Sequence, residues 1–157
     1  MTPQQIRDAI AASPALQALA AAGNTQGIAD ALSVGRTSLV SGTITTRGAA
    51  ALFPSLGGLP GALAFQLAHR KLVAFAATAK ASATLSTSLL GEAIELQITS
   101  FRDLGLDFSS AALREMLDII VASGGITADE AAGFKGLAVS VADPITHERV
   151  TAAIREV

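Results

Sequence analysis

The residues of this chain that could do chemistry are few and scattered. The two histidines are His69 and His147. His69 adjoins Arg70 and Lys71 on the polar side of a predicted helix, and neighbouring cations disfavour both a charged imidazole and a bound metal ion. His147 falls in the first turn of the last predicted helix, beside Glu148. We therefore expect both histidines to have a surface role and no catalytic one.

Carboxylates do not form a catalytic pattern. Glu92 and Glu95 are one helical turn apart on a face predicted to be solvated, whereas paired catalytic acids lie in a cleft with separated pKa values. Asp129 and Glu130 begin a predicted helix, where the helix dipole favours negative charge. Ser, His and Asp do not stand in the setting of a nucleophile elbow. The sequence therefore predicts neither an enzyme nor a small-molecule substrate.

Sites for metals, cofactors and phosphates are not indicated. The chain has no cysteine, so it has no disulfide and no thiolate metal site, which fits a reducing compartment. The Pro- and Gly-rich stretch 54–61 lacks the Lys-Ser or Lys-Thr that a phosphate-binding loop requires. We interpret this stretch as a hinge or linker, and we expect no cofactor.

The basic residues do not indicate a nucleic-acid partner. Arg70, Lys71 and Lys80 form only a thin patch, whereas nucleic-acid binding favours a dense basic surface with aromatic side chains that stack on bases. Phe65 and Phe75 fall on the opposite, apolar face of the same predicted helix.

Membrane insertion is also not expected. The longest uncharged stretch, 48–69, contains Pro54, Pro60 and a cluster of glycines, so it cannot form one continuous spanning helix. The N-terminus carries Arg7 and Asp8 and lacks a compact apolar segment, so we expect no signal peptide.

The elements that position these residues are predicted to be helices. Half of the residues are apolar, 15% are charged, and the apolar residues are largely Ala and Leu, which favour helix. The sequence predicts an all-α fold, a multi-helix bundle around a long helical hairpin at about 59–104 with one short extended arm at about 37–45. We expect a single helical domain, 1–157, with a short-helix subregion 1–35 and a C-terminal helical subregion 106–157.

Both helices of the predicted hairpin have a wide apolar band. In the first helix, apolar residues recur at helical spacing, and a further set widens the same face: Phe65, Ala68, Leu72, Phe75 and Ala79, then Leu63, Leu67 and Ala74. The second helix has two adjacent rows: Leu90, Ile94, Ile98 and Phe101, then Leu85, Leu89, Ala93 and Leu96. A band wider than one coiled-coil seam needs more than one neighbour. Those neighbours are either other helices of this chain or another protomer.

The stretch 36–45 is rich in β-prone residues. An isolated strand needs a partner, and no second strand is evident in the sequence. The stretch therefore either lies as irregular chain over the helices or pairs with another subunit.

Charge is distributed unevenly along the chain. Residues 31–91 contain five cations and no acid, whereas residues 92–157 contain eleven acids and five bases. If folding mixes the basic and the acidic half of the chain, their charges cancel. A protomer that keeps them apart could stack basic end to acidic end, and such heterologous contacts produce rings or filaments.

Four segments carry a resemblance to a known group of proteins. The segments are 45–48, 105–108, 113–118 and 125–135. The last of them contains a predicted capping box, formed by Thr127 and Glu130. Together they resemble small Ala-rich proteins encoded among the virion genes of tailed bacteriophages. The resemblance implies an assembly role in a phage particle, in the tail or head-to-tail region, and it implies no catalytic residues.

We therefore expect a structural or accessory virion component that is made in the host cytoplasm and binds other virion proteins, copies of itself, or both. The candidate interaction residues are Thr37, Leu39, Val40, Ile44, Arg47, Arg70 and Lys71. The alternative is a small soluble regulatory or adaptor protein that binds a partner helix in an apolar groove.

Overall fold

The computed structural model describes residues 1–155, which form nine helices and four strands of two or three residues. The predicted all-α class is confirmed, since helices dominate and the strands are short. Contacts divide the chain into two compact units, Met1–Ser38 with Ser140–Val157 (unit 1) and Leu39–Val139 (unit 2). This division differs from the expected single domain, and it splits the expected subregion 106–157 between the two units.

Unit 1 combines the two ends of the chain. Its elements are α1 (Pro3–Ala12), α2 (Pro14–Ala21), α3 (Thr25–Ser33), β1 (Thr37–Leu39), β4 (Ser140–Ala142) and α9 (His147–Arg155). The first two helices begin where a capping hydroxyl precedes a proline: Thr2 accepts a hydrogen bond from the Gln5 backbone N–H, and Ser13 accepts one from Leu16. Local sequence signals therefore define where these helices start.

The core of unit 1 lies between the N-terminal helices and α9. Its buried side chains are Ile6, Leu16, Ile28, Ala29, Ile145, Val150 and Ala153. Hydrogen bonds connect the same elements, since Arg7 Nη1 donates to the Ala153 carbonyl at 3.0 Å and the Ile145 backbone N–H donates to Ser33 Oγ at 2.8 Å. The last helix is thus part of the same core as the first.

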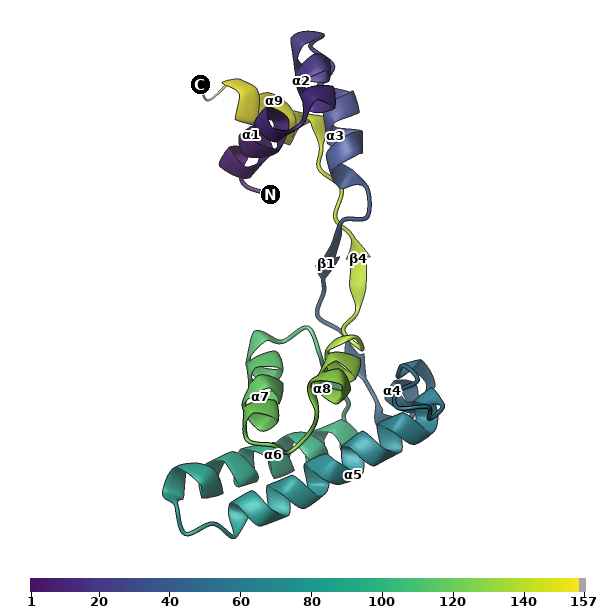
Figure 1. Ribbon diagram of the computed structural model, residues 1–157, viewed down its shortest axis with the longest axis vertical. Helices are drawn as coiled ribbons and strands as arrows, with labels where there is room; N and C mark the ends of the chain where they lie inside the picture. The colour runs from purple at the N-terminus through teal and green to yellow at the C-terminus, as the bar shows by residue number, and fades with distance from the viewer. Residues whose placement is uncertain (156–157) are drawn as a thin grey trace. The chain divides into compact units, whose positions relative to one another are not determined.

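Unit 2 is built on two long helices. Its elements are β2 (Thr43–Ile44), α4 (Thr46–Leu52), α5 (Gly61–Lys80), α6 (Leu85–Asp103), β3 (Leu106–Asp107), α7 (Ala111–Ala122) and α8 (Ala128–Lys135). α5 and α6 lie side by side, and α7 and α8 cover one side of the pair (Figure 1). α8 begins with the predicted capping box, in which Thr127 Oγ1 accepts from the Glu130 backbone N–H at 3.2 Å.

Phenylalanines form the centre of unit 2. Five of the six phenylalanines are at most 5% exposed, and their rings contact one another: Phe53, Phe65, Phe101, Phe108 and Phe134. Phe134 of α8 packs edge-on against Phe53 with ring centroids 5.1 Å apart, and against Phe65 of α5 at 6.0 Å. Such edge-to-face pairs contribute beyond the area they bury. The cluster therefore joins α8 to α5 and to the segment after α4.

Two glycines allow helices in unit 2 to approach closely. A Cβ on Gly91 of α6 would lie 2.3 Å from the backbone nitrogen of Lys80 in α5. A Cβ on Gly133 of α8 would lie 2.5 Å from the Phe53 ring. Gly133 weakens helix propensity, but its missing side chain makes room for the phenylalanine cluster.

The prediction of an unpartnered arm at 37–45 is wrong. β1 pairs with β4. β2 pairs antiparallel with β3, with Thr43 opposite Asp107 and Ile44 opposite Leu106. Both partner strands are distant in sequence and only two or three residues long, so they show no alternation that could reveal them.

The contact at Gly91 yields a prediction for stability. Gly91→Ala places a methyl group against the α5 backbone, and we expect it to lower the free energy of unfolding by about 1–3 kcal/mol, although alanine is the better helix former. Gly136→Ala is the matched control, because the nearest atom to its Cβ, the Ala132 carbonyl oxygen, would be 3.3 Å away. Urea unfolding followed by circular dichroism measures both. Equal stability of the two variants would contradict the close α5–α6 contact.

Candidate assembly surface

A row of exposed side chains runs along the outer side of α5. It consists of Leu63, Leu67, Arg70 and Ala74, which recur at intervals of four, three and four residues. Leu63 is 51% exposed and Leu67 is 44% exposed. At 100° per residue, Leu63 lies on the opposite side of the helix from Leu72, which is buried. The prediction that Leu63, Leu67 and Ala74 widen the core-facing band is therefore wrong.

α6 carries a second exposed row. It consists of Leu85, Leu89, Glu92 and Leu96, which again recur at intervals of four, three and four residues. The three leucines are 73%, 53% and 64% exposed, respectively. The inward face of α6 is occupied by Ile94 and Phe101, both at most 3% exposed. Of the predicted second apolar row of α6, the three leucines are thus left uncovered by the other helices of this chain, whereas Ala93 is half-buried.

A shallow depression adjoins the α6 row. It is lined by Ser86, Thr87, Leu89, Leu90 and Ile119, so it lies where α6 meets α7. Ile119 of α7 is itself 44% exposed. The apolar surface therefore continues from α6 onto α7.

Exposed leucines that share one helix face indicate an interaction site, whereas leucines scattered singly over a surface do not. Isolated exposed apolar residues are normal on soluble proteins, whereas a contiguous apolar patch marks an interaction site. Fully burying one leucine side chain contributes about 1.5–3 kcal/mol. The outer rows of α5 and α6, named here the α5 row and the α6 row, can therefore supply apolar area for association.

The buried carboxyl group of Glu130 in unit 2 has structural partners. Glu130, only 7% exposed, accepts from Lys71 Nζ at 2.7 Å and from the Thr127 backbone N–H at 2.8 Å. Burial alone would raise the pKa of the Glu130 carboxyl, but these hydrogen bonds and the Lys71 charge outweigh it, so the pKa is lowered. Lys71, predicted as an interaction residue, is thus occupied by an ion pair between α5 and α8.

His69 is less exposed than predicted. Its Nε2 atom is buried without a hydrogen-bond partner, and its ring stacks on Phe65 with centroids 5.7 Å apart. Burial lowers the pKa of the imidazole. The expectation of a surface histidine is wrong because the helix turns His69 towards Phe65 and Phe101 of the core.

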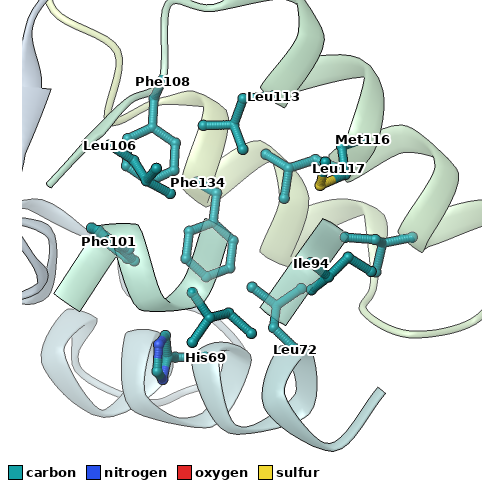
Figure 2. A pocket seen from close by; sticks show the side chains of 12 residues that line it. His69, Leu72, Ile94, Phe101, Leu106, Phe108, Leu113, Met116, Leu117 and Phe134 are labelled. Atoms are coloured by element: carbon teal, nitrogen blue, oxygen red, sulfur yellow. The ribbon is translucent and has the colours of Figure 1, made fainter. Parts of the chain in front are cut away.

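A small cavity lies beside this histidine. Figure 2 shows His69 at the edge of a group of apolar side chains that includes Leu72, Phe101 and Phe134. The cavity measures about 30 Å³, which is room for about one or two water molecules. Ligand pockets are far larger, at roughly 300–1,000 Å³.

The other predicted interaction residues do not form one surface. Thr37 and Leu39 are exposed on β1, and the Val40 backbone N–H donates to the Val139 carbonyl at 2.9 Å. Ile44 packs against the core of unit 2. Arg47 is exposed at the start of α4. Among the seven candidates, Arg70 alone belongs to the α5 row.

The leucine rows were not identified as a site from the sequence, although a signal was present. The intervals of four, three and four residues in both helices are those of a coiled-coil seam. The apolar bands are too wide to show which part faces the core, so the sequence leaves open whether other helices of this chain or another protomer cover the leucines.

Within residues 1–155, no group of three or more His, Cys, Asp or Glu side chains is placed to hold a metal ion. No helix in that part of the chain has the length and apolar character needed to cross a bilayer. Comparisons with protein-family models, curated proteins and solved structures gave no match.

The burial of His69 yields a prediction for pH dependence. Because its folded pKa lies below the ordinary value of 6.5, the unfolded chain binds more protons as the pH falls below that value. We expect the free energy of unfolding to decrease between about pH 7 and pH 5, and we expect His69→Phe to reduce this decrease.

His147→Gln is the control, because His147 is exposed on α9. Urea unfolding at several pH values measures all three proteins. An unchanged pH dependence in His69→Phe would show that His69 is not held neutral by burial.

Proposed function

We propose that this chain is a structural or accessory component of a tailed-phage virion, in the tail or head-to-tail region, and that it assembles through the outer faces of α5 and α6. The observation that carries the assembly role is the exposure of Leu85, Leu89 and Leu96 on one face of α6. The resemblance of segments 45–48, 105–108, 113–118 and 125–135 to virion-encoded proteins supports the location. The proposed partners are other virion proteins, copies of this chain, or both.

The physical argument is the cost of leaving these leucines in water. Apolar area removed from water contributes about 25 cal/mol per Å², and the uncovered leucines lie at helical spacing on adjacent helices. A partner that covers both rows gains this energy. Strands within 37–45 pair with other strands of the same chain. We therefore place the proposed interface on α5 and α6 and not on the expected arm.

A second candidate function has one observation in its favour. The depression lined by Leu89, Leu90 and Ile119 could receive an apolar side chain from a partner helix. This would fit a small regulatory or adaptor protein that is absent from virions.

The assembly role predicts self-association or binding to virion proteins. We expect size-exclusion chromatography with light scattering to give a mass above that of one chain, with refractive-index detection because the chain lacks Trp and Tyr. Leu89→Ser with Leu96→Ser should reduce the association, since both changes remove exposed apolar area. Leu104→Ser is the control, because Leu104 is 78% exposed just beyond the end of α6.

A monodisperse monomer at high concentration, with no binding to virion proteins, would contradict the assembly role. Mass spectrometry of purified particles separates the two candidate functions: a virion component is present in particles at a fixed ratio to other virion proteins, whereas an adaptor is absent.

A further inference from the structure

We infer that the partner of the α6 row is the α5 row of a second copy of this chain, with the two helices parallel and in register. This inference rests on the proposed assembly function and names the partner of the same surface. It is carried by the matched spacing of the two rows and by their opposite charges.

The spacing of the two rows is identical. Counted from the first leucine, the α5 row occupies positions 0, 4, 7 and 11 (Leu63, Leu67, Arg70 and Ala74), and the α6 row occupies the same positions (Leu85, Leu89, Glu92 and Leu96). All eight residues are exposed. In a parallel pair, residues at equal positions of a coiled-coil seam form layers across the interface. The layers are then two leucine pairs, one Arg–Glu pair, and one small residue against one large residue.

The charges within the rows are complementary. Arg70 of α5 and Glu92 of α6 occupy the same layer, and neither forms an ion pair among the described residues. Lys80 attracts Glu92 electrostatically, but its ammonium group is hydrogen-bonded to Glu95 at 2.5 Å. The third position of each row therefore carries a charge that a second copy can neutralise.

Other pairings of the same rows fit less well. An antiparallel pair with the same overlap would set Arg70 opposite Leu89 and Glu92 opposite Leu67, which places both charges against leucines. Pairing α6 with α6 in register would bring two Glu92 carboxylates together, and like charges across an interface cost several kcal/mol. The parallel α5–α6 pair avoids both conflicts.

This docking is directional. α5 and α6 of one copy are antiparallel neighbours joined by 81–84, and a two-fold axis that stacks two such pairs would make the α5–α6 contacts between copies antiparallel. A parallel contact is therefore heterologous: each copy offers α5 to one neighbour and α6 to another. Heterologous contacts close into rings or extend as filaments.

Charge reversal tests the pairing in the full-length chain. Arg70→Glu and Glu92→Arg each create a like-charge layer, so we expect each single variant to need at least about a tenfold higher concentration for half-maximal assembly. The double variant, Arg70→Glu with Glu92→Arg, restores an opposite-charge layer and should recover assembly. An equimolar mixture of the two single variants should also recover it, because each contact between unlike copies is complementary.

The control is Arg47→Glu, which reverses an exposed cation on α4 outside both rows. Circular dichroism of every variant checks that the helices are retained. Single variants that assemble like the wild type, or a double variant and mixture that stay dissociated, would overturn the α5–α6 pairing.

The same data separate this inference from the proposed function. If charge reversal has no effect while Leu89→Ser with Leu96→Ser abolishes assembly, the assembly role stands and the α5 row is not its partner. If the wild-type chain neither self-associates nor binds virion proteins, both fail.

Discussion

The structure of unit 2 depends on the packing of Phe134 among the other core phenylalanines. Phe134 is 1% exposed, and its ring contacts rings from the segment after α4, from α5 and from the segment before α7. This packing holds α8 against the inner side of the α5–α6 pair. Because the inner faces are filled in this way, the leucines at positions 63, 67, 85, 89 and 96 are left on the outer side.

Two polar groups have to fit into this apolar setting, and they do so differently. Glu130 stays charged because Lys71 and the α8 capping box supply its hydrogen bonds, which ties the start of α8 to α5. His69 has no partner for Nε2 and therefore favours the neutral form. Both groups are explained by the core that they adjoin, and the cavity beside His69, at about 30 Å³, is far smaller than a ligand pocket.

The sequence predicted features that depend on local signals. The predicted Thr127–Glu130 capping box is visible within four residues and begins α8. In the same local way, a hydroxyl residue directly before a proline begins α1 at Thr2 and α2 at Ser13. Features that depend on distant segments were missed, such as the β2–β3 pairing of Ile44 with Leu106. The exposure of the α5 row could not be predicted because composition gives both sides of an Ala-rich helix similar hydropathy. Which side faces inward is decided by the phenylalanines of other elements.

Disulfide cross-linking tests most directly whether α5 and α6 rows of different copies dock in parallel. The chain has no cysteine, so single Leu67→Cys and Leu89→Cys variants can be mixed and oxidised, with Leu63→Cys and Leu96→Cys mixed as the antiparallel comparison. The account predicts an efficient 67–89 disulfide between chains, since layer partners come within the Cα distance of about 4.4–6.8 Å that a disulfide needs. Preferential 63–96 cross-linking, or none from either mixture, would contradict it.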